Sequence, residues 1–93
     1  MPKKEITNCL WACRRKNGLS QQKVAVFLGH KKSSQLSHYE CGRKLPNLTT
    51  ALKLEIIYRT PVAFLFYDLY SRLREEIRTK ELRAEINPED VTK

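Results

Sequence analysis

Residues 18–46 constrain the fold most, because turn-forming residues divide them into two short helices. Ser20 is a suitable N-cap for the first helix, which is predicted to end before Gly29. Either serine of Ser33–Ser34 can cap the second helix, which is predicted to end at Gly42. The pattern predicts two helices joined by a tight turn.

The rest of the chain also has the apolar spacing of helices, and it has no strand pattern or internal repeat. We therefore predict an all-α fold. The expected further helices cover residues 4–16, ending at Asn17-Gly18, then 48–58, capped by Asn47, a short fifth helix opened by Thr60-Pro61, and 67–86. The predicted core positions are Ile6, Leu10, Cys13, Val24, Ala25, Leu28, Leu36, Tyr39, Val62, Leu65 and Phe66.

The positive charge of the chain is concentrated in one half. Residues 1–46 contain ten Lys or Arg and two acidic residues, whereas residues 47–93 contain eight of each, so the first half carries the whole net charge of +8. A basic half with two short helices joined by a turn is typical of a protein that binds a polyanion. Duplex DNA is the polyanion that this pattern favours.

The cysteine count and the apolar runs argue against several other classes of protein. Three cysteines (Cys9, Cys13 and Cys41) without a CxxC pair favour neither a disulfide framework nor a zinc site. No apolar run approaches the roughly 18 residues of a membrane span, and the N-terminus lacks the apolar stretch of a secretory signal. We expect a cytoplasmic protein with no membrane contact, metal or cofactor. No catalytic arrangement of side chains has supporting context, so we expect no enzymatic activity.

The positions that carry a resemblance to a known family are spread over residues 10–66. They are Leu10, Arg14, Gly18-Leu19-Ser20-Gln21, Val24-Ala25, Leu28-Gly29, Leu36-Ser37, Glu40, Gly42 and Pro46. In this register the chain resembles the Cro/CI-type helix-turn-helix family, also called XRE, of phage repressors and bacterial regulators. The resemblance implies a five-helix, lambda-repressor-like DNA-binding domain, to which the last helix is an addition. Between Gly29 and Leu36 the chain has one residue more than the family pattern, so either the preceding helix is longer or the turn at 29–33 bulges.

The resemblance implies which residues touch DNA. In the family the third helix lies in the major groove and the second helix crosses the phosphate backbone. By position, the base-reading residues are Ser33, Ser34, Gln35 and His38. The phosphate-binding residues are Gln21, Lys31, Lys32, Arg43 and Lys44, and Arg14 and Glu40 form a partly buried ion pair between the first and third helices. The alternatives are that the serines only cap a helix, that Gln35 and His38 are ordinary solvated residues, and that the cations are plain surface charge.

The chain divides into three parts: residues 1–66 as the DNA-binding domain, 67–86 as an amphipathic helix and 87–93 as a flexible tail. The leading hypothesis is a sequence-specific transcriptional regulator, a repressor of bacterial or phage origin, that binds duplex DNA as a homodimer. The helix at 67–86 then serves dimerisation or packs on its own domain. The alternative is an antitoxin that binds DNA through the same motif and holds a toxin through this Arg-rich helix, with Arg72, Arg74, Arg78 and Arg83.

Overall fold

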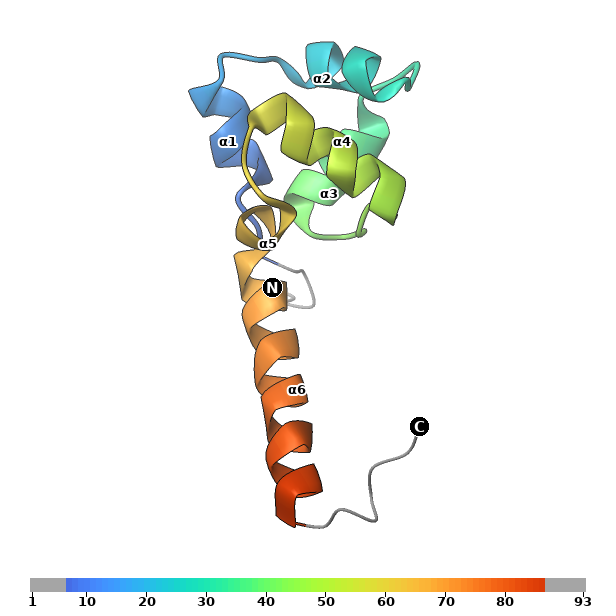
Figure 1. Cartoon of the computed structure of the whole chain (residues 1–93). Helices are drawn as coiled ribbons and strands as arrows, with labels where there is room; N and C mark the ends of the chain where they lie inside the picture. Colours follow the sequence, from blue (N-terminus) through green and yellow to red (C-terminus); the bar gives the residue numbers. More distant parts are fainter. Residues whose placement is uncertain (1–6, 87–93) are drawn as a thin grey trace.

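The computed structural model describes residues 7–86, and all regular structure in this range is α-helical (Figure 1). The helices are α1 (Leu10–Lys16), α2 (Gln21–Leu28), α3 (Ser34–Cys41), α4 (Leu48–Tyr58), α5 (Val62–Leu65) and α6 (Tyr67–Ile86). The predicted all-α fold is confirmed for this part of the chain. None of these helices is both long and apolar enough to cross a membrane.

The core of the molecule lies where α1 to α5 meet. Each of these five helices contributes at least one fully buried apolar side chain, the largest being Leu10, Val24, Leu36, Leu54 and Leu65. Helices of this length are marginal alone in water, so the shared apolar surface holds them together. The predicted core positions between residues 10 and 66 are buried, except Val62, which is only partly buried.

Local sequence signals set most of the helix ends. The side chains of Ser20 and Asn47 each accept a hydrogen bond from the backbone amide three residues further on, at 3.0 and 2.9 Å. Each contact satisfies an amide that has no partner within its own helix. α2 and α3 end at Gly29 and Gly42, which take left-handed φ angles of 87° and 80°. Glycine adopts such angles without a steric penalty, and both predicted helix ends are confirmed.

α1 begins at Leu10, so the predicted start near Lys4 is wrong. Asn8 Oδ1 accepts a hydrogen bond from Leu10 N at 2.9 Å, and residues 7–9 are not helical. An asparagine side chain that accepts a hydrogen bond from a backbone amide at the start of a helix favours a non-helical backbone at its own position. The helix therefore does not extend toward the N-terminus beyond this point. The predicted core position Ile6 lies outside the described residues.

The start of α5 also differs from the prediction that Thr60 caps it. The Thr60 hydroxyl donates to the Tyr58 carbonyl at 3.0 Å, and Pro61 stands just before the helix rather than inside it. Glu55 Oε1 accepts a hydrogen bond from Val62 N at 3.0 Å instead. A side chain of α4 therefore caps α5, a contact made only once the two helices lie against each other.

The connection between α2 and α3 holds the extra residue. Gly29 turns left-handed directly after Leu28, and the His30 amide donates to the Ala25 carbonyl at 2.9 Å. These contacts close the end of α2. α2 is therefore not lengthened, and the extra residue lies in the stretch from His30 to Ser33.

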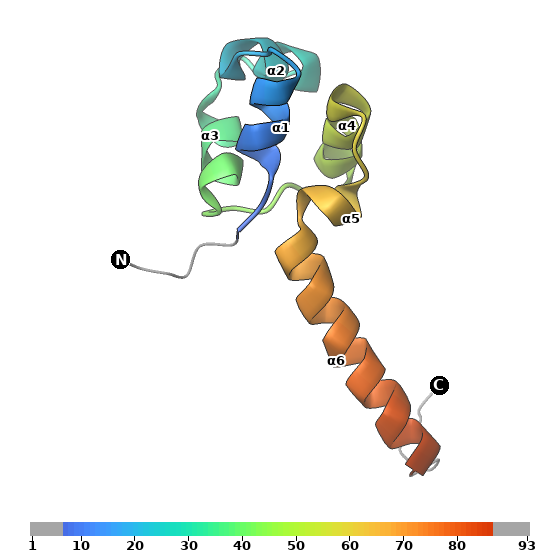
Figure 2. The same cartoon turned by 90° about the vertical axis from the view of Figure 1, so that its left-hand side faces the viewer.

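α6 extends away from the body formed by α1 to α5 (Figure 1, Figure 2). Its 20 residues make the molecule elongated, with extents of 51 × 31 × 22 Å. Leu69, near the start of α6, is half-buried against the core, whereas Leu73 and Ile77 are 49% and 53% exposed. The apolar stripe of α6 is therefore not covered by the chain's own domain.

Candidate nucleic-acid interface

The rotation of α3 about its axis is fixed by its buried face. Leu36 is fully buried in the core, and this leaves Ser34 and Gln35 exposed. Ser33 and His38 are half-buried. Ser34, Gln35 and His38 follow the helical spacing of residues that share one side of a helix. The structure thus brings the predicted base-reading residues to the start and one side of α3.

The surface around α3 carries charge of one sign. Lys31 and Lys32 are exposed in the connection before α3, and Arg43 and Lys44 are exposed directly after it. Glu40 is the only acidic residue among residues 7–46, and its side chain is only 5% exposed. Within this range no carboxylate offsets the four cations at the surface. Such a surface attracts a polyanion.

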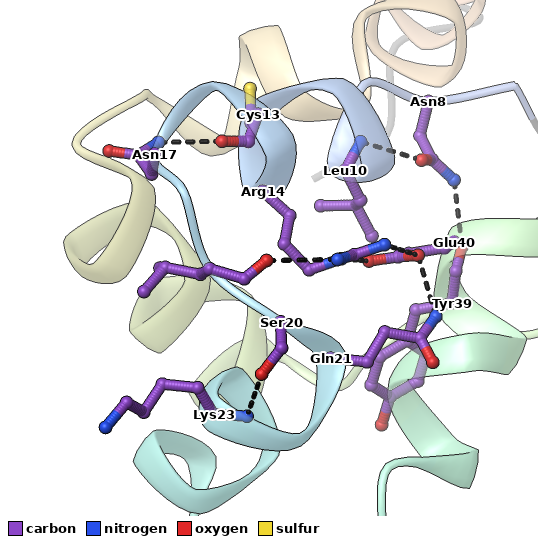
Figure 3. Close-up of polar contacts among 11 residues, drawn as sticks. Asn8, Leu10, Cys13, Arg14, Asn17, Ser20, Gln21, Lys23, Tyr39 and Glu40 are labelled. Carbon is purple, nitrogen blue, oxygen red and sulfur yellow. Dashed lines mark hydrogen bonds and ion pairs between the residues drawn. The ribbon is translucent and has the colours of Figure 1, made fainter.

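Glu40 is held by residues of two other helices (Figure 3). Its Oε2 lies 2.6 Å from Arg14 Nε, and its Oε1 accepts hydrogen bonds from Arg14 Nη2 at 3.3 Å and from Gln21 Nε2 at 2.9 Å. Arg14 Nη1 donates to the Leu19 carbonyl at 3.0 Å. Arg14 and Glu40 therefore form a nearly buried ion pair between α1 and α3, and this ion pair also fixes the first residue of α2.

Gln21 occupies the position that we predict for a phosphate contact, but its side chain is already engaged. Gln21 Nε2 donates one of its two N–H groups to Glu40, which holds the side-chain amide against the ion pair. The first amides of a helix have no partner within it, and Ser20 satisfies only the amide of Lys23. A phosphate contact at Gln21 can therefore use the backbone N–H, at the positive end of the α2 dipole, together with the second N–H of the side-chain amide.

Gln35 and Lys44 are brought within hydrogen-bond distance of each other. Lys44 Nζ, from the segment after α3, donates to Gln35 Oε1 at 3.3 Å. The contact turns the amide oxygen of Gln35 toward Lys44 and leaves both N–H groups of the amide free to donate. One of the predicted phosphate-binding residues thus touches one of the predicted base-reading residues.

Comparison with protein families agrees with this arrangement. A family model described as Helix-turn-helix matches residues 12–65, which is more than half of the chain. The chain belongs to the Cro/CI-type helix-turn-helix family. Neither the curated proteins nor the solved structures give a significant match. Membership of this family makes the protein a DNA-binding regulator of the XRE type.

Asn8 also stabilises the helix-turn-helix domain, although no role is predicted for it from the sequence. Asn8 Nδ2 donates to the Tyr39 carbonyl at 2.9 Å and so joins the start of α1 to α3. An asparagine just ahead of an apolar helical pattern is a typical helix start. The signal is hidden here because Ile6, Leu10 and Cys13 extend the same apolar spacing back through it.

Tyr58 and the three cysteines are further titratable side chains of the helix-turn-helix domain. The Tyr58 hydroxyl is buried without a hydrogen-bond partner. Desolvation raises its pKa well above the ordinary value, and the negative charge of Glu40 adds to the effect. Cys13 is buried, Cys9 is half-buried, and Cys41 is exposed. Among residues 7–86 no group of three or more His, Cys, Asp or Glu side chains could hold a metal ion.

Proposed function

We propose that this protein is a sequence-specific regulator that places α3 in the major groove of duplex DNA. The observation that carries the proposal is the charge around α3, where four flanking cations are exposed while Glu40 is buried against Arg14. DNA carries one negative charge per roughly 1.7 Å of its axis. A protein surface that carries only positive charge is therefore attracted to DNA more strongly than a surface of mixed charge. α3 itself bears polar, uncharged side chains on its exposed side, which suits contact with base edges.

The flanking cations supply affinity and position. Lys31 and Lys32 before α3, and Arg43 and Lys44 after it, would neutralise phosphates on the two sides of the groove. The backbone N–H of Gln21 would bind a further phosphate at the start of α2. These contacts do not depend on the DNA sequence.

The residues of α3 supply discrimination between sequences. Gln35 can bond through both ends of its amide to adenine, and His38 can donate to the acceptors of guanine. Ser33 stands at the N-cap position of α3 but makes no capping hydrogen bond with its side chain. Its hydroxyl, like that of Ser34, is therefore available to the DNA.

A single α3 contacts about four to six base pairs, which is too few to define a site in a genome. We therefore propose that two copies bind an inverted repeat, with the two-fold symmetry of the dimer matching that of the site. A protein held on such a site blocks access of other proteins to the same DNA. Repression is the sign of regulation that this arrangement favours.

A second candidate function is favoured by the exposed stripe of α6. Leu73 and Ile77 lie uncovered on a helix that extends from the DNA-binding body (Figure 2). An antitoxin would use such a terminal helix to hold a toxin while binding DNA through α2 and α3. In that case α6 serves a different protein rather than a second copy of this chain.

Selection of random duplex DNA by the purified protein tests these functions. Selection at about 150 mM salt suppresses binding through phosphates alone. We expect enrichment of an inverted repeat, and repetition with Gln35→Ala should relax the preference at one base position of each half-site. Enrichment of a single short site would keep DNA recognition but remove the dimer on DNA. Absence of any enriched sequence would contradict sequence-specific binding and would leave α6 as a surface for a protein partner.

A further inference from the structure

α6 carries an apolar stripe that is interrupted by Lys80 between Ile77 and Ala84 and that no other described element covers beyond its first turn. Leu69, Tyr70, Leu73, Ile77 and Ala84 recur at the spacing of one face of a helix. The stripe passes through two open grooves of about 390 and 380 Å³, which share Tyr70 and Leu73. Exposed apolar surface of this kind marks a contact with another molecule.

The charges beside the stripe are arranged in a definite order. At 100° per residue, Arg74 and Glu81 border one side of the stripe, and Glu76 and Arg83 border the other. On each side one residue near the start of α6 is followed, seven residues later, by one of opposite charge. Residues 67–86 hold five basic and five acidic side chains, so a second copy of α6 is not repelled by net charge.

We infer that α6 pairs side by side with α6 of a second copy of this chain, in antiparallel orientation. In the register that sets Leu73 opposite Ala84 of the second copy, Ile77 lies opposite the second copy's Lys80. The aliphatic stem of Lys80 can cover Ile77 while its ammonium group reaches water. A large residue thus faces a small one at each end of the paired stripes.

The same register brings opposite charges together along both edges of the pair. Antiparallel helices set each edge against the same edge of the partner, so Arg74 faces Glu81 of the second copy and Glu76 faces Arg83 of the second copy. Two-fold symmetry makes each of these pairs occur twice. Four attractive pairs therefore flank the apolar contact.

A parallel pairing of α6 is disfavoured by the same residues. In parallel helices each edge meets the opposite edge of the partner about five residues further on, which sets Glu76 against Glu81 of the second copy. Lys80 would also face its own equivalent in the middle of the contact. Like charges then replace the attractive pairs, so the order of charges selects the antiparallel form.

Antiparallel pairing also sets the separation of the two points where the bodies join their α6 helices. The two copies of Phe66, where each body joins its α6, would be separated by about 25 helical residues, or about 37 Å along the helices. Successive major grooves on one side of DNA lie about 34–36 Å apart. The two junctions thus stand about one such spacing apart; this comparison rests on the proposed function, whereas the pairing of the helices does not.

Sedimentation equilibrium of the full chain without DNA tests the pairing. We expect a dimer at about 100 µM, where even a small interface is populated. Glu76→Arg and Arg83→Glu each turn two attractive pairs into repulsive ones, so each variant alone should raise the dissociation constant about tenfold. An equimolar mixture of the two variants again sets opposite charges against each other and should restore a dimer, now of one copy of each.

Glu75→Arg is the matched control, because it makes the same change of charge on the side of α6 opposite the stripe. It should leave the dissociation constant within a factor of two to three of the wild type. Circular dichroism of each variant checks that α6 remains helical. A monomeric wild-type chain, a stronger dimer with Glu76→Arg, or a mixture that stays monomeric would each overturn the antiparallel pairing. Because no DNA is present, none of these outcomes depends on the proposed DNA binding.

Discussion

Glu40 joins three helices through one carboxylate. It pairs with Arg14 of α1 at 2.6 Å, accepts a hydrogen bond from Gln21 of α2 at 2.9 Å, and itself belongs to α3. It is also the only acidic residue among residues 7–46, so at the surface it would cancel part of the charge that faces DNA. The burial of Glu40 therefore holds the three helices together and keeps its negative charge away from the positively charged surface of the domain.

Replacement of Glu40 by glutamine should lower the free energy of unfolding by about 3 kcal/mol, because the Arg14 guanidinium then stays buried without its counter-charge. Urea denaturation of both proteins measures the difference. Glu75→Gln removes an exposed carboxylate instead and should change stability by less than about 0.5 kcal/mol. Equal stability of Glu40→Gln and the wild type would show that the ion pair contributes little.

Tyr58→Phe should leave stability at neutral pH unchanged or slightly higher, since the buried hydroxyl has no hydrogen-bond partner. The raised pKa of Tyr58 has a separate consequence at high pH. Above about pH 10 the unfolded chain loses this proton while the folded chain keeps it, so wild-type stability should fall by up to about 1.4 kcal/mol per pH unit.

Urea denaturation at pH 7 and pH 11 measures both effects of Tyr58→Phe. The wild type should lose more stability between these pH values than the variant does, because the variant has no hydroxyl to ionise at this position. Tyr67→Phe is the control, since Tyr67 is exposed and should behave as the wild type. A marked loss of stability in Tyr58→Phe at pH 7 would mean that the hydroxyl makes a stabilising contact after all.

α3 carries the residues that we propose to read DNA, and the resemblance to the family implies one additional residue in the connection before it. Because α2 ends at Leu28 and α3 is regular from Ser34, the extra residue shifts only the stretch from His30 to Ser33. Gln35 and His38 keep their positions relative to the buried Leu36. The proposed contacts of Gln35 and His38 therefore follow the family arrangement more closely than that of Ser33.

Two substitutions beside each other on this surface should have different effects on DNA binding. Gln35→Ala should weaken binding to the selected site by about 1–3 kcal/mol and leave binding to random DNA nearly unchanged. Lys44→Ala should weaken binding to both and reduce the slope of log K against log salt by about one unit. Fluorescence anisotropy at several salt concentrations measures both quantities.

Arg72→Ala is the matched control for Lys44→Ala, because it removes one exposed positive charge from α6 rather than from the segment after α3. It should leave the salt slope unchanged. Identical effects of Gln35→Ala and Lys44→Ala on specific and random DNA would contradict the placement of α3 in the major groove.

The whole molecule combines a basic body with an arm, α6, whose positive and negative charges balance. Residues 1–46 carry the net charge of +8, while residues 47–93, which include α6, are neutral overall. The body therefore binds the polyanion, and the arm can meet another copy without repulsion. The number of protein copies that bind one DNA site can then be measured.

The salt dependence of the binding constant should show how many protein copies bind one DNA site. Four phosphate-contacting cations per body predict a slope of log K against log salt of about −3.6 for one copy and about −7 for two. Anisotropy titrations of the selected site between about 50 and 200 mM salt cover the useful range. A slope near zero would contradict binding through phosphates, whatever the number of copies.

Local chemistry in the sequence determined the helices of this protein. Ser20, Asn47, Gly29 and Gly42 act within one turn of the chain, so they set helix ends whatever surrounds them. The apolar spacing likewise determined which side of each helix is buried. The uneven charge and the family register predicted a DNA-binding surface at α3.

Contacts between distant residues were decided only by the tertiary structure. Glu55 caps α5, Asn8 joins α1 to α3, and Gln21 donates one N–H to Glu40. Each contact depends on where two helices lie relative to each other, which no local pattern encodes. The position of α6 is of the same kind. Its sequence predicted an amphipathic helix, but only the tertiary structure shows that α6 extends away from the body and that Leu73 and Ile77 stay exposed.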